Sequence, residues 1–243
     1  MDTTLQERGL VKTRSMARSV IMAGRVYVDG RRVDKAGTLV GVDSEIVLKD
    51  GGLRHVSRGG LKLEAALGEF GIDPAGMVAV DIGASTGGFT DCLLQHGASK
   101  VHAVDVGYGQ LDWSLRNDAR VRLLERLNAR YLTHEDIGER VDIATVDVSF
   151  ISLEKVIPPL KSILKPGGAL IALIKPQFEV GKGEVGKGGV VRDEAKHKAV
   201  VDKIRDFLTG LGFSVKGVMP SPILGAEGNK EFLICAVLEG GGK

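Results

Sequence analysis

The chain has 243 residues, of which 43% are hydrophobic and 26% charged, with a net charge of +2, a composition typical of a globular protein with one large and one small domain. Its purely apolar runs, such as residues 169–174, are far shorter than the ~20 residues of a bilayer-spanning helix, and its first residues lack a secretory pattern. We therefore expect no membrane partner and a cytoplasmic location. Cys92 and Cys235 lie far apart and outside any C-x-x-C motif, which argues against a disulfide framework or a metal site.

The charge is distributed unevenly along the chain. Residues 1–60 contain 11 lysines and arginines against 7 acidic residues, a net charge of +4, whereas the remainder carries −2. A basic module on a near-neutral body suits a polyanionic partner, because neutralising phosphates releases counterions and supplies affinity without sequence specificity. A solvated charged face would have the same composition, so charge alone leaves both interpretations open.

The basic segment has the local pattern of a helix followed by a hairpin. Thr13 is suited to cap a helix over residues 14–23, and Gly24 is suited to end it. Residues 25–33 alternate around an Asp-Gly turn, which predicts a β-hairpin with arginines at its ends. This segment resembles the S-four-type RNA-binding domain, most specifically in AGRVYVDGRRV. The arginines that we expect to contact RNA are Arg14, Arg18, Arg25, Arg31, Arg32 and Arg58.

A turn-rich connection at residues 50–53 follows the basic segment. We place the domain boundary there, which gives a small α+β RNA-binding domain at residues 1–52 and a second domain at residues 53–243. A helix expected over residues 61–70 would bury one apolar face and leave Lys62 on its rim, where a lysine is ordinarily a solvated surface residue.

The most informative segment is DIGASTGGFT at residues 81–90, between an apolar run and a helical pattern. A strand, a glycine-rich turn and a helix start bring backbone N–H groups and a positive dipole end to a ligand. The dinucleotide fingerprint G-x-G-x-x-G needs a glycine where this chain has Ser85, so NAD is disfavoured. The pattern matches S-adenosylmethionine (SAM) sites instead, where a carboxylate near a cationic ligand is favourable. The loop residues that we expect to bind SAM are Asp81, Gly83, Ser85, Thr86, Gly87, Gly88 and Phe89.

A second strand ends in Asp105, 24 residues after Asp81, at a position suited to bind ribose hydroxyls. A tight strand-to-helix turn without a ligand is the alternative for the glycine loop taken alone. The presence of Asp105 weighs against that alternative.

From residue 77 onward strand and helix patterns alternate, which predicts a mostly parallel sheet with helices on both faces. Seven strand candidates fit the Rossmann-like, SAM-dependent methyltransferase version of this α/β fold. They are residues 77–82, 100–106, 121–125, 142–148, 169–175, 215–220 and 231–238. In such sheets ligands bind outside the carboxyl ends of the strands. The residues that end these strands, and are therefore candidates for the chemistry, are Asp81, Asp105, Asp147 and Lys175.

The motif after the fourth of these strands narrows the chemistry. Methyltransferases of base amino groups carry Asp/Asn-Pro-Pro-aromatic there, and carbon-5 cytosine methyltransferases use a Pro-Cys nucleophile. This chain has Asp147-Val148-Ser149-Phe150, so neither signature is present. What remains is a carboxylate, a lysine one strand over, Glu231 at the start of the last strand and Lys62 from the helix before the sheet.

With these residues the chain closely resembles the TlyA family, ribosomal RNA 2′-O-methyltransferases whose catalytic domain is of the FtsJ type. The resemblance covers nearly the whole chain and rests on six ordered blocks: VSRGGLKL, DIGASTGGFTDCLL, DVGYGQLDW, DVSFISL, LIKPQFE and GNKEF. It implies a catalytic set of Lys62, Asp147, Lys175 and Glu231, and a SAM site lined by Gly83, Gly87, Phe89, Asp105 and Asn128. We also expect Asp147 to contact SAM, at the junction of cofactor and base. The resemblance further implies that the target is a cytidine in large-subunit rRNA, and in some members also small-subunit rRNA, on an assembled ribosome or subunit.

The chemistry of the reaction supports assigning these roles to the matching residues of this chain. Methylation of a ribose hydroxyl requires the oxygen to lie in line behind the sulfonium methyl and to lose its proton. Two lysines that share a desolvated site each give up a proton more readily, so Lys175 could serve as base or hydroxyl orienter with Lys62 as its electrostatic partner. Asp147 and Glu231 would orient the two amines.

Several alternatives stay open. The glycine-rich residues 176–193 form either a mobile lid over RNA or a plain loop. Residues 181–187 match the spacing of a phosphate-binding loop, but Gly188 stands where a Mg²⁺-binding Ser or Thr belongs, which argues against an NTPase. Trp113 and Tyr108 either stack on a nucleobase or pack in the core.

Two other classes of function also remain. A noncatalytic RNA-binding factor for ribosome assembly or translation would use the same basic head. A membrane-active haemolysin is a label that the TlyA family has carried. The sequence leaves the oligomeric state open.

Overall fold

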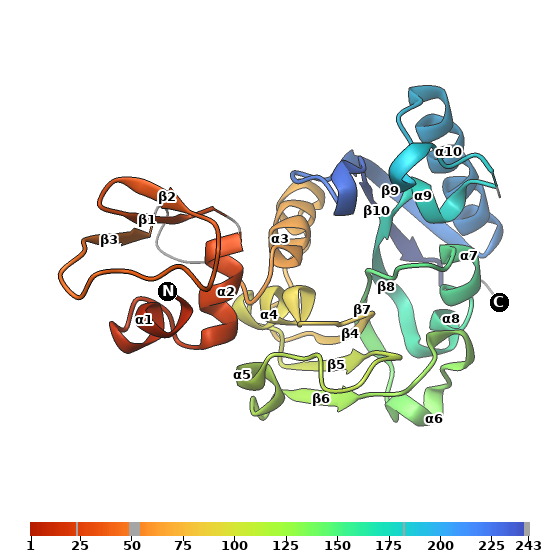
Figure 1. Ribbon diagram of the computed structural model, residues 1–243. Coiled ribbons are helices and arrows are strands. Elements are labelled where there is room, and N and C mark those ends of the chain that lie inside the picture. Colours follow the sequence, from red (N-terminus) through yellow and green to blue (C-terminus); the bar gives the residue numbers. More distant parts are fainter. Residues whose placement is uncertain (23, 49–53, 182, 241–243) are drawn as a thin grey trace. The chain divides into compact units, whose positions relative to one another are not determined.

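The computed structural model describes residues 1–22, 24–48, 54–181 and 183–240. The chain divides into two compact units, Met1–Arg58 and Gly59–Lys243 (Figure 1). The domain boundary that the sequence predicts, at residue 52, lies outside the described residues. Each unit has its own hydrophobic core.

The first unit combines two helices with a three-stranded antiparallel sheet. Thr13 caps the second helix by accepting a hydrogen bond from the N–H of Met16 over 3.1 Å, as the sequence predicts. Val20, Ile21 and Val26 are fully buried and form part of the core. The first helix and the third strand, of six and three residues, are too short for their periodicity to be recognised in advance. The elements are α1 Asp2–Glu7, α2 Arg14–Met22, β1 Val26–Val28, β2 Arg31–Val33 and β3 Ile46–Leu48.

A seven-stranded sheet forms the centre of the second unit, with the strand order β6-β5-β4-β7-β8-β10-β9. The strands β4 to β8 run parallel and β10 runs antiparallel to β8 and β9, which confirms the expected mostly parallel sheet. Each predicted strand is present, and β8 begins earlier than expected. The strands are β4 Val78–Ile82, β5 Lys100–Val104, β6 Val121–Leu124, β7 Val141–Val146, β8 Leu164–Ile174, β9 Phe213–Pro220 and β10 Phe232–Leu238.

Helices cover both faces of this sheet, with α3 and α4 on one face and α7, α8 and α10 on the other (Figure 1). None of the helices in the described part of the chain is long and apolar enough to cross a bilayer. The helices are α3 Gly59–Phe70, α4 Gly88–Gln95, α5 Trp113–Arg116, α6 His134–Ile137, α7 Leu153–Val156, α8 Leu160–Ile163, α9 Pro176–Glu179 and α10 Glu194–Gly210, with 3-10 turns at Ala129–Tyr131, Lys187–Gly189 and Ala226–Gly228.

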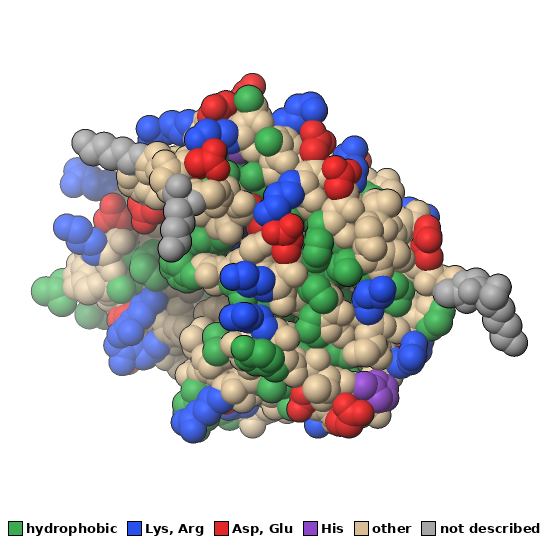
Figure 2. All heavy atoms as spheres, turned by 90° about the vertical axis from the view of Figure 1, so that its right-hand side faces the viewer, with side chains coloured by type: hydrophobic (Ala, Val, Ile, Leu, Met, Phe, Trp, Pro, Cys, Tyr) green, Lys and Arg blue, Asp and Glu red, His purple; other side chains and the backbone are tan. Residues whose placement is uncertain are grey.

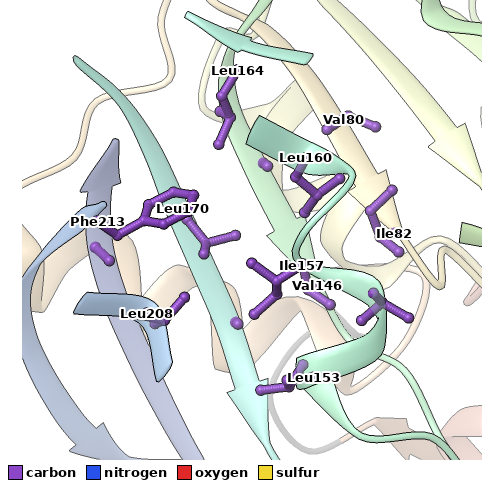
Figure 3. Close-up of a cluster of buried hydrophobic side chains, with 14 of the residues drawn as sticks. Val80, Ile82, Val146, Leu153, Ile157, Leu160, Leu164, Leu170, Leu208 and Phe213 are labelled. Carbon is purple, nitrogen blue, oxygen red and sulfur yellow. The ribbon is translucent and has the colours of Figure 1, made fainter. Parts of the chain in front are cut away.

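The main core lies between the sheet and the second group of helices (Figure 3). Ile82 and Val146 from the strands meet Leu153 and Leu160 from the helices, and all four side chains are almost completely buried. Each such side chain stabilises the fold by about 1.5–3 kcal/mol relative to an exposed position. Because Ile82 and Val146 are the last residues of β4 and β7, this packing fixes the positions where both strands end.

The strand β4 lies between β5 and β7, and the chain extends the sheet from it in both directions. The strand order therefore reverses at β4. In open α/β sheets ligands bind at such a point, outside the carboxyl ends of the strands. The antiparallel β10 begins where β8 ends, because Phe232 pairs with Ile174. One edge of the sheet therefore collects the ends of β4, β5, β7 and β8 and the start of β10.

Candidate active site at the carboxyl edge of the sheet

The glycine loop joins the end of β4 to the start of α4. The N–H groups of Gly83 and Ala84 both donate to the carbonyl oxygen of Val104, over 2.9 and 3.1 Å, and tie the loop to β5. Gly83 has a φ of +82°, and a Cβ at this position would collide with the backbone carbonyl of Asp147 after β7. Only glycine satisfies both conditions, so the loops after β4 and β7 can approach each other closely.

Asp105 follows β5 and is held through both of its carboxylate oxygens. Its Oδ2 accepts from the N–H of Ser85 over 2.7 Å, and its Oδ1 accepts from the N–H of Gly107 over 2.6 Å. Each carboxylate oxygen can accept a further hydrogen bond. The side chain is thus fixed in place and still able to accept from hydroxyls, which fits its expected role at a ribose.

A cleft of about 470 Å³ opens at this edge, within the usual size range of small-molecule sites. The predicted SAM residues that line it are Gly83, Ser85, Asp105, Asn128 and Asp147. The rest of its wall is mostly apolar and was not anticipated, because apolar residues beside a strand end are indistinguishable from core in a sequence. These residues are Ile82, Val104, Val106, Gln110, Leu127, Ala129, Val148, Ser149, Phe150, Ile151 and Val156.

The other predicted residues of the glycine loop are not part of the cleft lining. Thr86 is exposed, and Gly87, Gly88 and Phe89 are buried where the loop enters α4. Gly87 has a φ of +97°, and a side chain there would collide with Leu115. The structure gives these residues a role in packing and in starting the helix, and their direct contact with a cofactor stays a prediction.

Asp81 is the most deeply buried acidic residue near the glycine loop. Its side chain is fully buried, with Thr90 Oγ1 donating to Oδ2 over 2.7 Å and Thr145 Oγ1 donating to Oδ1 over 2.9 Å. Burial raises the pKa of this carboxyl to about 6, although the two hydroxyls lower it. In the structure the residue joins β4 to α4 and β7 beneath the loop, and its role beside a cationic ligand stays a prediction.

Lys175 follows β8 and lies against two side chains of the loop after β7. Its Nζ is 2.5 Å from Oδ1 of Asp147 and donates to Oγ of Ser149 over 3.0 Å. The first contact is an ion pair rather than an aligned hydrogen bond, because Oδ1 of Asp147 has no hydrogen-bond partner of good geometry within the described residues. The Lys175 and Asp147 side chains are 11% and 22% exposed, so the pair is largely desolvated, and its Asp147 member lines the cleft.

Lys62 extends from α3 to Glu231, and its Nζ donates to Oε2 over 2.6 Å. Both residues are buried, so Lys62 is not the solvated surface residue that its place on the helix predicts. Burying a charge is costly unless it is paired, and each side chain is the counterion of the other. If the pairing of Phe232 with Ile174 is continued by one residue, Glu231 faces Lys175 across neighbouring strands. The predicted catalytic set therefore forms two ion pairs, one where β7 and β8 end and one between α3 and the start of β10.

A second hollow of about 580 Å³ lies between α10 and the strands β9 and β10. Glu231 belongs to its lining, whereas Asp147 lines the first cleft. The four charged residues thus extend along the sheet edge from one hollow to the other.

The predicted RNA-binding arginines all lie in the first unit. Arg14 and Arg18 are exposed and each forms an ion pair of 3.0 Å with Asp2, and the two guanidinium groups lower the pKa of Asp2 well below its ordinary value. A guanidinium has five N–H donors, so both can still bind phosphate. Of the others, Arg31, Arg32 and Arg58 are exposed and Arg25 is half-buried.

Acidic, basic and hydrophobic side chains are interspersed over the face that Figure 2 shows. Such a mixture of signs attracts a polyanion less than a cluster of arginines does. Trp113 and Tyr108 are 73% and 67% exposed, which excludes the core-packing alternative for both. Their stacking on a nucleobase stays a prediction, as does a lid function for residues 176–193.

Comparison with known proteins shows the family to which the chain belongs. The model of the FtsJ-like methyltransferase family matches residues 55–238, and that of the S4 domain matches residues 2–46. The 16S/23S rRNA (cytidine-2′-O)-methyltransferase TlyA of Mycobacterium tuberculosis is 47% identical over 96% of this chain and 88% of the relative. The chain belongs to the TlyA family of FtsJ-like methyltransferases. The resemblance predicted from the six sequence blocks is thereby confirmed.

Other relatives of this TlyA family member carry a different name. Hemolysin A of Brachyspira hyodysenteriae is 42% identical over 96% of this chain and 97% of its own length. The solved structure of a proposed hemolysin from Streptococcus thermophilus is 46% identical, covers 98% of this chain and 87% of its own, and has a TM-score of 0.79. A SAM-dependent methyltransferase of Listeria monocytogenes shares only 15% identity over 75% of this chain and 99% of its own, with a TM-score of 0.57, and confirms the fold alone.

Proposed function

We propose that this TlyA family member transfers the methyl group of SAM to the 2′-hydroxyl of a cytidine in ribosomal RNA, in the cytoplasm and on assembled ribosomal subunits. The observation that carries the proposal is the Lys175–Asp147 ion pair at the cleft that Gly83 and Asp105 line. The M. tuberculosis relative is named for both 16S and 23S rRNA, and a Campylobacter jejuni relative for 23S rRNA alone. Large-subunit RNA is therefore the first target to test, and small-subunit RNA the second.

The cleft fits SAM in its donor set and its shape. Asp105 offers fixed acceptors for the ribose hydroxyls, the apolar wall suits an adenine, and the loop at Gly83 brings backbone close to the ligand. When bound, SAM supplies an electrophilic methyl group on a sulfonium. Asp147 lines the same cleft and pairs with Lys175, so it lies where the cofactor and the acceptor hydroxyl would meet.

The charged residues orient the acceptor hydroxyl and take up its proton. The reaction breaks a sulfur–methyl bond, forms an oxygen–methyl bond and releases the hydroxyl proton. Because Lys175 is paired with Asp147, we favour Lys175 as the donor that holds the attacking oxygen in line, with the proton taken up by the pair. The Lys62–Glu231 pair keeps the adjacent strand start ordered and neutral in net charge.

The proposal is tested by transfer of radiolabelled methyl groups from SAM to purified ribosomal subunits, followed by mapping of the modified nucleotide. Lys175→Met should bind SAM within about 3-fold of the wild type by calorimetry and lose transfer by at least about 1000-fold, because it removes only the group that handles the hydroxyl. Lys161→Met, at an exposed lysine on α8, is the matched control and should transfer normally. Normal transfer by Lys175→Met would reject the role of this residue.

The same experiment separates the alternatives. A noncatalytic RNA-binding factor would bind subunits and transfer no label. The names of the hemolysin relatives favour membrane damage as a second candidate function. Leakage of dye from liposomes, equal for the wild type and Lys175→Met, would support that function independently of methyl transfer.

A further inference from the structure

The loop after β7 and the segment that follows β8 contact each other along their length. At one end Lys175 pairs with the loop, and in the middle the ring centroids of Phe150 and Phe178 are 4.9 Å apart. At the other end Oε1 of Glu179 accepts a hydrogen bond from the N–H of Leu153 over 2.8 Å. Both ends of the loop after β7 are therefore bound to the same short segment, residues 175–179.

The loop between these two fastenings is strained. Phe150 has a φ of +63°, a region that bulky L residues rarely adopt and that costs ~1–3 kcal/mol. Such a conformation persists only where surrounding contacts enforce it. If the hydrogen bond between Leu153 and Glu179 were lost, the backbone at Phe150 could relax and carry Asp147 and Ser149 away from the Lys175 amine.

Glu179 is an unusual residue for a core position. It is 8% exposed, and its Oε2 receives no hydrogen bond within the described part of the chain. Burial raises the pKa of this carboxyl, against hydrogen bonds from the Leu153 N–H and the Ser152 hydroxyl that lower it. A buried carboxyl with one unsatisfied oxygen stabilises a core less than an amide or an apolar group would. The presence of Glu179 is better explained by the hydrogen bond that its Oε1 accepts from the Leu153 N–H.

We propose that Glu179 is a positioning residue for methyl transfer: it holds the strained loop after β7 so that Asp147 and Ser149 stay against Lys175. It acts through Leu153 and the loop, at the end of the segment remote from the Lys175 amine. The proposal rests on the proposed function, because it concerns the same charged residues.

Two substitutions at this position and one control test the proposal by turnover. Glu179→Gln keeps an acceptor for the Leu153 N–H, so its turnover should stay within about 2-fold of the wild type, whereas Glu179→Ala should lose about 10- to 100-fold. Leu208→Ala, in the buried face of α10, is the control for a general loss of stability and should keep its turnover at temperatures where it is folded. Equal turnover of Glu179→Ala and wild type, or an equal loss in Leu208→Ala at matched thermal stability, would overturn the proposal.

Hydrogen exchange at the Leu153 amide gives a second measure that does not depend on activity. Exchange should accelerate by at least about 10-fold in Glu179→Ala and stay unchanged in Glu179→Gln and Leu208→Ala at temperatures where each is folded. If the wild type transfers no label, the proposed function fails, and the exchange pattern alone decides whether Glu179 holds the loop. Unchanged exchange in Glu179→Ala would reject the positioning role in either case.

Discussion

Replacing Asp81 by asparagine isolates the buried charge beneath the glycine loop. Burial raises the pKa of this carboxyl from 3.8 to about 6 in the folded protein. The folded state therefore holds this proton more tightly than the unfolded chain does. The resulting stabilisation is complete below pH ~3.8 and is lost as the pH rises through ~6, above which the fold has to contain a buried carboxylate.

The size of the effect follows from the two pKa values. A rise from 3.8 to about 6 corresponds to about 3 kcal/mol of unfolding free energy, lost between these pH values. The asparagine introduced in D81N would keep an oxygen for one threonine hydroxyl and would not titrate, so this variant should lack the loss. We expect the unfolding free energy of the wild type, minus that of D81N, to fall by about 3 kcal/mol between about pH 4 and pH 7.

Urea unfolding followed by circular dichroism at several pH values measures this difference. Carboxyls whose pKa is lowered by ion pairs, such as Asp118 beside Arg120, change stability in the opposite direction, but they are common to both proteins and cancel. Asp118→Asn is therefore a control whose difference from the wild type should have the opposite pH dependence. A difference between wild type and D81N that stays constant across the range would refute the account of Asp81.

Three further changes test other parts of the structure. Gly83→Ala forces a Cβ against the loop after β7 at a positive φ, and calorimetry should show SAM affinity reduced by at least about 10-fold. Lys62→Met leaves the Glu231 carboxylate buried and unpaired, which should cost about 3–5 kcal/mol in denaturant unfolding, and the double change Lys62→Met with Glu231→Leu should regain most of it. Replacing Arg14 and Arg18 by alanine should make the salt dependence of rRNA binding shallower, by about one unit of slope for each phosphate that the protein no longer neutralises; an unchanged slope in filter binding would place the RNA elsewhere.

The strands of the second unit could be predicted because their signal is local. Runs such as residues 170–174 are buried on both faces, and continuous apolar sequence is typical of central parallel strands. The early start of β8 could not be predicted, because Pro166, Gly167 and Gly168 indicate a turn by themselves. Pairing of Leu164 with Val141 of β7 overrides that local preference, and this pairing is a property of the whole sheet.

The residues of the candidate site also fall into those whose positions could be predicted from local sequence and those whose positions could not. Asp105, Asp147 and Lys175 could be found because each directly follows a strand whose apolar run is visible in the sequence. The burial of Asp81 and Lys62 could not, since it depends on Thr145 and Glu231, which lie 64 and 169 residues away along the chain. The sequence shows which residues end the strands, and only the folded chain shows which of them face the cleft.

The reversed direction of β10 has a consequence for the synthesis of this protein. The lining of the cofactor cleft is complete at Val156, but Glu231 opens the last strand of the sheet. Lys62 therefore lacks this counterion in any chain that has not yet reached residue 231. The full set of charged residues is therefore assembled only once β10 has been made and has paired with β8.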